Sequence, residues 1–427
     1  MYLKIDELPV DPSWSFADLT RTQTGYISHA YYSYPAKFIP QLAARLIREY
    51  SCAGDTIVDP FVGSGTTAVE ALVQARRAVG VDINPVAYLV AGVKTTPLPP
   101  DRLAQEFEFV AHDLALIDFA KGPPAAGWPA IIPASDRIDY WFPPGQKEKL
   151  GVILGRISAV QDKACREFFL VAFSQALKAC SIWDQRSTKP TRDLRKRPSD
   201  PRRVFLRKSR YMLKHNQEFW DRVPEHVRAA LPDYRVIECA DARSVPCQDE
   251  QASLIVTSPP YVTSYEYADL HQLTALWLDY VESLSEFRKQ FIGSVALGRP
   301  AIDMKSALAV GICNEMRESK RVDEVRNYFA DMLECFQEMH RVLKPGGKAC
   351  IVIGNTVLQG VQIANAQVFL EQMENIGFRA HDIIKREIPA KILPQTRDPH
   401  NGRFTSSSDS KKVQAYPVEY ILVMEKR

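Results

Sequence analysis

The chain has 427 residues, of which 46% are hydrophobic, and its formal net charge is +3. This length allows two or three domains or one elaborated α/β domain, and the hydrophobic share is ordinary for a protein with a buried core. No stretch approaches the roughly 18 apolar residues that cross a bilayer, the start has no signal-peptide pattern, and the eight cysteines and eight histidines show no disulfide or metal-binding spacing, so we expect a cytosolic protein without a metal.

The first regular pattern is a βαβ unit within residues 55–98. TIVDPF predicts a strand, GSGTTAVEALVQA a glycine turn that opens a helix, and AVGVDIN a second strand. Gly63 and Gly65 permit a tight turn, and a helix that begins near Thr66 offers free N–H groups to an anion. Asp82 follows Gly63 by 19 residues, at a strand end where a carboxylate can bind ribose hydroxyls. The unit predicts a nucleoside-bearing cofactor, either a nicotinamide dinucleotide or S-adenosylmethionine, on a doubly wound sheet.

A largely helical insertion is expected over residues 99–234, where helical patterns alternate with proline breaks. Residues 186–214 hold twelve basic and two acidic side chains, a balance of +10 that leaves −7 for the rest of the chain. A concentrated basic segment in a mildly acidic chain indicates polyanion binding, and a solvated loop is the alternative. The candidate nucleic-acid-binding residues are Arg192, Arg195, Lys196, Arg197, Arg202, Arg203, Arg207, Lys208 and Arg210.

Strand and loop patterns resume after the insertion, at YRVIECADAR and ASLIVTSPPY. The run SLIV predicts a buried parallel strand, which Pro259 and Pro260 end because neither can donate a backbone hydrogen bond. The carbonyl groups of Ser258 and Pro259 then lie at the carboxyl edge of the sheet, where open α/β sheets bind ligands. A simple turn that caps the strand is the alternative. Later patterns predict a helix, a strand, a second helix and a closing strand, at 323–343, 348–356, 366–377 and 417–426.

Four segments together resemble the amino-group DNA methyltransferases, and within them the cytosine-N4 branch. They are YPAKFIP at 34–40, DPFVGSGTT at 59–67, GVDINP at 80–85 and TSPPY at 257–261. The resemblance covers about half of the chain and implies a class I S-adenosylmethionine-dependent methyltransferase fold. This is a Rossmann-like α/β fold with a mostly parallel, doubly wound sheet, here with a largely helical insertion.

The resemblance also implies how the chain is organised. Residues 1–98 and 235–427 are expected to form the methyltransferase domain, and the insertion at 99–234 is the candidate target-recognition region. The order of the motifs resembles the class called alpha, except that ADAR follows the insertion instead of preceding it. The irregular segment 281–320 is therefore a second candidate for contact with DNA.

Residue roles follow from the match to the family's motifs. Matching residues bind S-adenosylmethionine as follows: Asp59, Phe61, Gly63, Gly65 and Thr66 around the methionine end, Asp82 at the ribose and Asp241 beside the adenine. Lys37 and Phe38 match the segment that closes over the methionine moiety, with a solvated lysine as the alternative for Lys37.

The catalytic segment implied by the resemblance is Ser258, Pro259, Pro260 and Tyr261. The Ser258 hydroxyl and the Pro259 carbonyl would accept hydrogen bonds from the exocyclic amine, and Tyr261 would stack on a base that is flipped out of the duplex. No covalent nucleophile is required. Two aromatic residues nearby are further candidates for this pocket, with ordinary packing as the alternative: Tyr265 and Tyr267.

Serine at position 258 bears on the choice of base. Serine there is typical of the cytosine-N4 branch, whereas adenine-N6 enzymes mostly carry Asp or Asn. We therefore expect a site-specific cytosine-N4 methyltransferase of double-stranded DNA in the prokaryotic cytosol, serving restriction–modification or epigenetic marking, with a separately encoded restriction endonuclease as a partner. Adenine-N6 methylation is the first alternative, and an RNA methyltransferase or an inactive DNA-binding subunit are further ones. A nicotinamide oxidoreductase would leave TSPPY unexplained.

Overall fold

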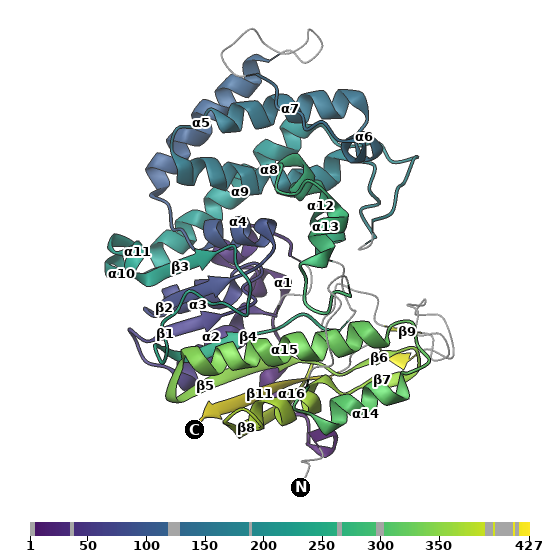
Figure 1. The fold of residues 1–427 in the computed structure, drawn as a ribbon. Coiled ribbons are helices and arrows are strands. Elements are labelled where there is room, and N and C mark those ends of the chain that lie inside the picture. Colours follow the sequence, from purple (N-terminus) through teal and green to yellow (C-terminus); the bar gives the residue numbers. More distant parts are fainter. Residues whose placement is uncertain are drawn as a thin grey trace.

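A seven-stranded sheet forms the centre of the protein, and a helical body stands beyond its β3 edge (Figure 1). The computed structural model describes residues 5–34, 38–117, 129–187, 190–262, 267–295, 303–388, 396–397, 413–414 and 418–427. The strands, in the order in which they pair, are β3 (Arg235–Glu238), β2 (Arg77–Val81), β1 (Thr56–Asp59), β4 (Ala252–Thr257), β5 (Leu343–Ile353), β11 (Val418–Lys426) and β8 (Phe378–Glu387). β11 is antiparallel to both neighbours, and the pairs from β3 to β5 are parallel. The expected class I α/β fold is confirmed.

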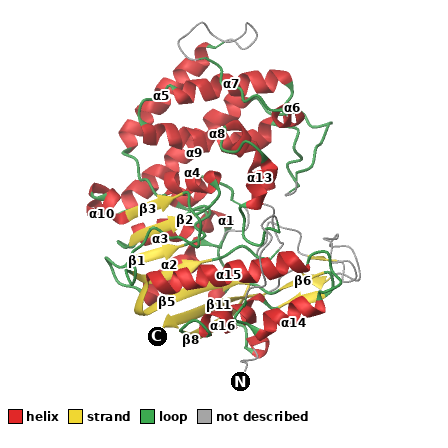
Figure 2. Cartoon of the chain, viewed as in Figure 1, coloured by secondary structure: helices red, strands yellow, loops and turns green. Residues whose placement is uncertain are grey.

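Both faces of the sheet are covered, which explains why the central strands are continuously apolar. Every residue of β1 and β4 is buried. In β4, Leu254 and Val256 pack into one hydrophobic cluster with α2 (Pro40–Tyr50) and α3 (Thr66–Val73). Ile255 points to the other face, where it packs with α15 (Val322–Val342) and α16 (Asn365–Glu374). The sheet is thus the middle of three layers, in which helices flank the strands on both sides (Figure 2).

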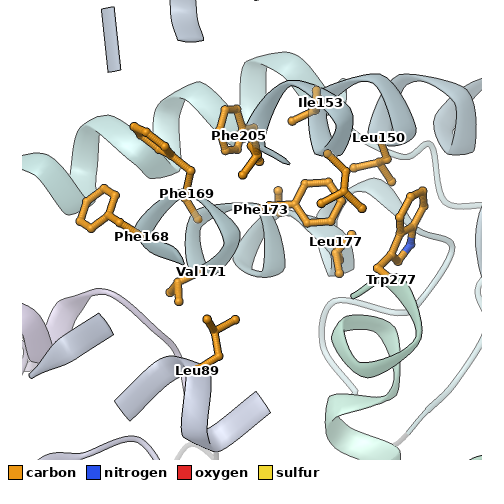
Figure 3. Close-up of a cluster of buried hydrophobic side chains, with 14 of the residues drawn as sticks. Leu89, Leu150, Ile153, Phe168, Phe169, Val171, Phe173, Leu177, Phe205 and Trp277 are labelled. Atoms are coloured by element: carbon orange, nitrogen blue, oxygen red, sulfur yellow. The ribbon is translucent and has the colours of Figure 1, made fainter. Parts of the chain in front are cut away.

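The helical body contains the predicted insertion and more. Its helices within 99–234 are α5 (Pro100–Leu116), α6 (Asp136–Trp141), α7 (Pro144–Ser158), α8 (Lys163–Cys180), α9 (Pro201–Arg222), α10 (Glu225–Ala229) and α11 (Leu231–Tyr234). Figure 3 shows Phe173 of α8 beside Trp277, which comes from α12 (Tyr267–Trp277), and Leu89 of α4 (Pro85–Lys94) packs into the same cluster. The core of this body therefore draws on residues outside the predicted boundaries.

The remaining elements are short or lie at the edges. They are η1 (Ile5–Glu7), η2 (Pro12–Trp14), α1 (Arg21–Thr24), η3 (Ile27–Ala30), α13 (Leu284–Lys289), α14 (Ala307–Glu315), β6 (Thr356–Leu358), β7 (Val361–Ile363), β9 (Thr396–Arg397) and β10 (Val413–Gln414). Among the described residues, no helix combines the length and apolar character that crossing a bilayer requires.

Candidate active site

A pocket of about 300 Å³ lies at the carboxyl ends of the parallel strands. Its wall is built by the segments that follow β1, β2, β3 and β4, so the glycine loop, Asp82, Asp241 and the SPPY segment meet there. A segment at 288–295 and the first turns of α15 complete the wall. The parallel sheet thus brings together motifs that are almost 200 residues apart in the sequence, as the position of ligand sites in open α/β sheets predicts.

The two glycines of the loop have different roles. Gly63 lines the pocket with φ of +48°, and its N–H donates a hydrogen bond to Asp82 Oδ2 over 3.0 Å. Gly65 caps α3 with φ of +79° but is absent from the pocket wall. A Cβ atom at position 65 would lie 3.1 Å from the Cα atom of Ala91 in α4, so this glycine is required by the packing of two helices. The prediction that Gly65 contacts the cofactor therefore finds no support in its position.

Thr66, the first residue of α3, offers a polar group to the pocket. Its side chain lines the wall, and its Oγ1 atom is buried without a hydrogen-bond partner among the described residues. A buried hydroxyl normally has a partner, so this one fits a polar group of a bound molecule. Phe61 and Phe38 add apolar surface to the same wall, while Lys37 lies outside the described residues.

Two buried carboxylates stand at the ends of β1 and β2. Asp59 accepts hydrogen bonds from Thr257 Oγ1 over 2.6 Å and from the Phe61 N–H over 3.1 Å. Asp82 accepts from the N–H groups of Gly63 and Asn84, over 3.0 and 2.9 Å. Burial raises the pKa of each carboxyl to about 6, and in Asp59 the neighbouring charge of Asp82 adds to the effect. A cation or a hydroxyl donor in the pocket would stabilise the ionised forms of both groups.

Asp241 lines the pocket but has a strong partner. Arg243 donates to both of its carboxylate oxygens, from Nε over 2.9 Å and from Nη2 over 2.6 Å. The same guanidinium group reaches Asp331 of α15 at 3.2 Å. Asp331 in turn accepts a hydrogen bond from the Gly293 N–H over 2.8 Å. Arg243 and Asp331 thus connect the loop after β3 with the segment 288–295 on the pocket wall.

The SPPY segment follows β4 directly, as predicted. Ser258, Pro260 and Tyr261 line the pocket, whereas Pro259 is buried and absent from the wall. Burial raises the pKa of Tyr261 well above its ordinary value, so its phenol stays neutral and lies 3.4 Å from Glu419 Oε2. This arrangement presents a hydroxyl and an aromatic ring to a ligand, and it gives the Pro259 carbonyl no evident access to one.

Two parts of the wall were missed by the sequence patterns. Tyr328 of α15 is buried, lines the pocket and donates a hydrogen bond from its hydroxyl to the Pro260 carbonyl over 2.8 Å. Within the segment 288–295, Arg288 pairs with Asp269 of α12. An amphipathic helix and an irregular segment carry no local signal for such positions. Tyr267 also lines the pocket, while Tyr265 lies outside the described residues.

The basic segment divides into a loop and a helix. Its first half is an irregular stretch between α8 and α9, where Arg192, Arg195 and Arg197 are exposed. Lys196 is half-buried and donates to the carbonyl groups of Lys178 and Trp183, over 2.8 and 2.6 Å. The ammonium group of Lys196 therefore fixes the loop and is not presented to a ligand.

The second half of the basic segment is the beginning of α9. Arg203, Arg207 and Arg210 are exposed at helical spacing, on the side opposite the buried Val204 and Phe205. Two further candidates are half-buried, Arg202 and Lys208, and Arg202 Nη1 donates to the carbonyl groups of Leu114 and Ile117. Six of the nine predicted basic residues are thus exposed, three on the loop and three on the helix.

Comparison with known proteins agrees with this geometry. Residues 4–91 and 252–427 match a family model described as DNA methylase. The chain is 25% identical over 434 residues to the type II methyltransferase M.MvaI of Kocuria varians, a match that covers 93% of this chain and 92% of that protein. It is 22% identical over 413 residues to the type II methyltransferase M.BsoBI of Geobacillus stearothermophilus, covering 82% and 78%. A solved structure of a DNA modification methylase from Thermus thermophilus with S-adenosyl-L-methionine is 16% identical over 42% of this chain and 50% of that chain, with a TM-score of 0.21, which is too low to support an argument.

Proposed function

The chain belongs to the N6/N4 DNA methylase family, and from this premise we propose that it is a site-specific DNA methyltransferase that acts on the exocyclic N4 amine of cytosine. The observation that carries the choice of base is the Ser258 hydroxyl on the pocket wall, next to the ring of Tyr261. The sequence resemblance associates serine at this position with cytosine-N4 enzymes.

S-adenosylmethionine is the cofactor, and the pocket residues fit it. Asp82 would accept hydrogen bonds from the ribose hydroxyls, and the buried hydroxyl of Thr66 would bind a polar group of the methionine end. Asp59 and Asp82 provide negative charge for a ligand that is positively charged at sulfur. When bound, the cofactor supplies an electrophilic methyl group, so the protein needs to provide orientation and hydrogen-bond acceptors.

The target base would be held by the SPPY segment. Ser258 Oγ accepts a hydrogen bond from the exocyclic amine, which favours a nitrogen lone pair that is less delocalised into the ring. Tyr261 stacks on the base, a contact worth roughly 1–3 kcal/mol. Tyr328 holds the Pro260 carbonyl and so fixes the backbone between these two side chains. The base must leave the duplex to reach this pocket, because a stacked base cannot enter the edge of a sheet.

The proposed macromolecular partner is double-stranded DNA. The exposed arginines of the loop and of α9 provide positive charge for the phosphates. Both long relatives are named type II methyltransferases, and we assign this chain the same place in restriction–modification, with a separately encoded restriction endonuclease as its partner and the prokaryotic cytosol as its location.

Identification of the modified nucleoside tests the proposed function. Unmethylated DNA is incubated with the protein and S-adenosylmethionine, digested to nucleosides and analysed by mass spectrometry against standards. N4-methylcytosine is the expected product, and N6-methyladenine would replace the cytosine assignment by the adenine one. 5-Methylcytosine would contradict the mechanism, because methylation of the ring carbon needs a cysteine nucleophile and none of the described residues on the pocket wall is a cysteine.

A further inference from the structure

The loop between α8 and α9 presents a leucine to solvent. Leu194 is 76% exposed, the highest value among the large hydrophobic side chains of the described residues. Isolated exposed leucines are common on protein surfaces and by themselves indicate nothing. The way in which this one is held, and the charges around it, distinguish it from the others.

The turn that carries Leu194 is firmly attached to the helical body. Asp193 N–H donates to the Ile182 carbonyl over 2.8 Å, and Asp193 Oδ1 accepts from the Arg195 N–H over 3.0 Å. Immediately after the turn, the half-buried ammonium group of Lys196 donates to two backbone carbonyls of the α8 end. Placing a cation inside the body costs solvation energy. That cost secures a defined position for the tip, on which Leu194 stands.

Positive charge surrounds the exposed leucine. Arg192, Arg195 and Arg197 are exposed, and no ion pair engages them among the described residues. The acidic residues of the loop are already used, since Asp193 accepts within the turn and Asp200 accepts from the Arg203 N–H at the start of α9. An apolar tip between cations is complementary to duplex DNA, which has phosphates outside and stacked bases inside.

The loop is connected to the pocket by a chain of contacts. The guanidinium group of Arg192 lies over the ring of Tyr140 in α6, at 4.1 Å. The next residue, Trp141, donates from Nε1 to Gln272 Oε1 of α12 over 3.0 Å. α12 begins at Tyr267, which lines the pocket. In Figure 1 the loop between α8 and α9 projects from the helical body beside α6. DNA on this loop therefore lies within reach of the same wall that receives the base.

We propose that Leu194 enters the duplex as a wedge next to the target base and fills the space that the base leaves, while the flanking arginines hold the phosphates. The inference rests on the proposed function, since a wedge serves only an enzyme that removes a base from the stack. An acidic protein would also be attracted by the arginines, but it offers no stack of bases for the leucine.

The test compares two duplexes that differ only at the target base pair. The modified position is first mapped by sequencing DNA from cells that express the protein. One synthetic duplex then carries the target base normally paired, and the other carries it opposite an abasic site, where flipping costs little. Single-turnover methyl transfer from S-adenosylmethionine is measured for the unchanged protein, Leu194→Ala, Leu194→Met and Leu116→Ala. Leu116 is 72% exposed at the end of α5 and serves as the matched control.

The wedge predicts a defined pattern of rates. Leu194→Ala should methylate the paired duplex at least about tenfold more slowly and regain most of the rate on the abasic duplex, because only the paired duplex has to be unstacked. Leu194→Met should retain the rate on both duplexes, and Leu116→Ala should behave like the unchanged protein. The salt dependence of DNA binding should be the same for all four proteins.

Three results would overturn the proposal in distinguishable ways. An unchanged rate of Leu194→Ala on the paired duplex would show that the leucine does not enter DNA. An equal decrease on both duplexes would assign Leu194 to surface contact instead of base flipping. If the unchanged protein methylates neither duplex nor any other DNA, the proposed function itself fails before the variants are compared.

Discussion

The Tyr328 hydroxyl donates a hydrogen bond to the Pro260 carbonyl over 2.8 Å, and so joins α15 to the SPPY segment. Tyr328 is buried, and its ring stacks on Phe369 with the ring centres 6.2 Å apart. The phenol therefore comes from a fixed position. Pro260 lies between Ser258 and Tyr261, the two side chains assigned to the amine and to the ring of the base, so this hydrogen bond sets the distance between them.

Removing this hydrogen bond should slow methyl transfer without weakening cofactor binding. Tyr328→Phe keeps the ring and loses one neutral hydrogen bond, worth about 0.5–1.5 kcal/mol. We expect the single-turnover rate to fall by roughly two- to tenfold, while calorimetry finds an unchanged affinity for S-adenosylmethionine. Tyr420→Phe is the control, since Tyr420 donates to Asp6 over 2.7 Å away from the pocket. Equal rates in the two variants would remove Tyr328 from the positioning of the segment.

Cofactor affinity should depend on pH through the two buried carboxyls. Burial raises the pKa of Asp59 and of Asp82 to about 6 in the free protein. A cationic ligand and ribose hydroxyls bind the ionised carboxylates better, so affinity for S-adenosylmethionine should rise as pH increases from about 5 to about 7. Asp82→Asn should weaken binding and reduce this dependence. Calorimetry at several pH values checks both, and a flat affinity profile of the unchanged protein would contradict the assignment.

The same two carboxyls affect the stability of the protein without cofactor, with the opposite sign. Their folded-state pKa values lie above the ordinary value of 3.8, so the folded protein binds more protons than the unfolded chain between about pH 4 and 6. The stabilisation from these protons is complete below about pH 4 and is lost as pH rises through about 6. Their contribution to the free energy of unfolding should thus decrease over this range, and saturating cofactor should diminish the decrease. Denaturant titrations of the free protein and of Asp82→Asn isolate the contribution.

Thr66 and Gly65 are neighbours for which opposite outcomes are expected. Thr66→Val removes a buried hydroxyl that has no partner among the described residues, so stability should stay the same or rise, while cofactor affinity falls up to about tenfold. Gly65→Ala places a Cβ atom 3.1 Å from the Cα atom of Ala91 at φ of +79°, which should cost about 1–3 kcal/mol of stability. Chemical denaturation and calorimetry on both variants separate the two roles. A Thr66→Val variant with unchanged affinity would take this hydroxyl out of the cofactor site.

Much of the site was predictable because its motifs are contiguous. The glycine loop, Asp82 and SPPY each follow a buried strand directly, and parallel strands bring their carboxyl ends to one edge. Tyr328 was not predictable, because a buried tyrosine in an amphipathic helix resembles any core residue until the packing of α15 is known. Gly65 looked like a ligand contact for a related reason: the sequence shows the need for glycine but not whether a cofactor or α4 imposes it.

The insertion illustrates a second limit. Its helical character followed from periodicity, but α12 joins its core from beyond residue 234 because Trp277 fills a space between aromatic side chains of α8 and of the α6–α7 turn. Charge counting treated the basic segment as uniform. The structure instead shows that Lys196 and Arg202 bind backbone carbonyls, which only tertiary contacts reveal.

The exposed arginines of the basic segment can be tested as two sets. The loop set, Arg192, Arg195 and Arg197, is linked to the pocket wall through α6 and α12, and the helix set, Arg203, Arg207 and Arg210, is not linked in this way among the described residues. Replacing the loop set by glutamine should weaken binding to all DNA sequences alike and reduce the log–log salt slope by about 0.9 for each phosphate that is no longer neutralised. The same replacement in the helix set should have a smaller effect, and neither should change cofactor affinity. Fluorescence anisotropy between about 50 and 200 mM salt measures both sets, and a slope that falls only for the helix set would move the proposed DNA contact from the loop to α9.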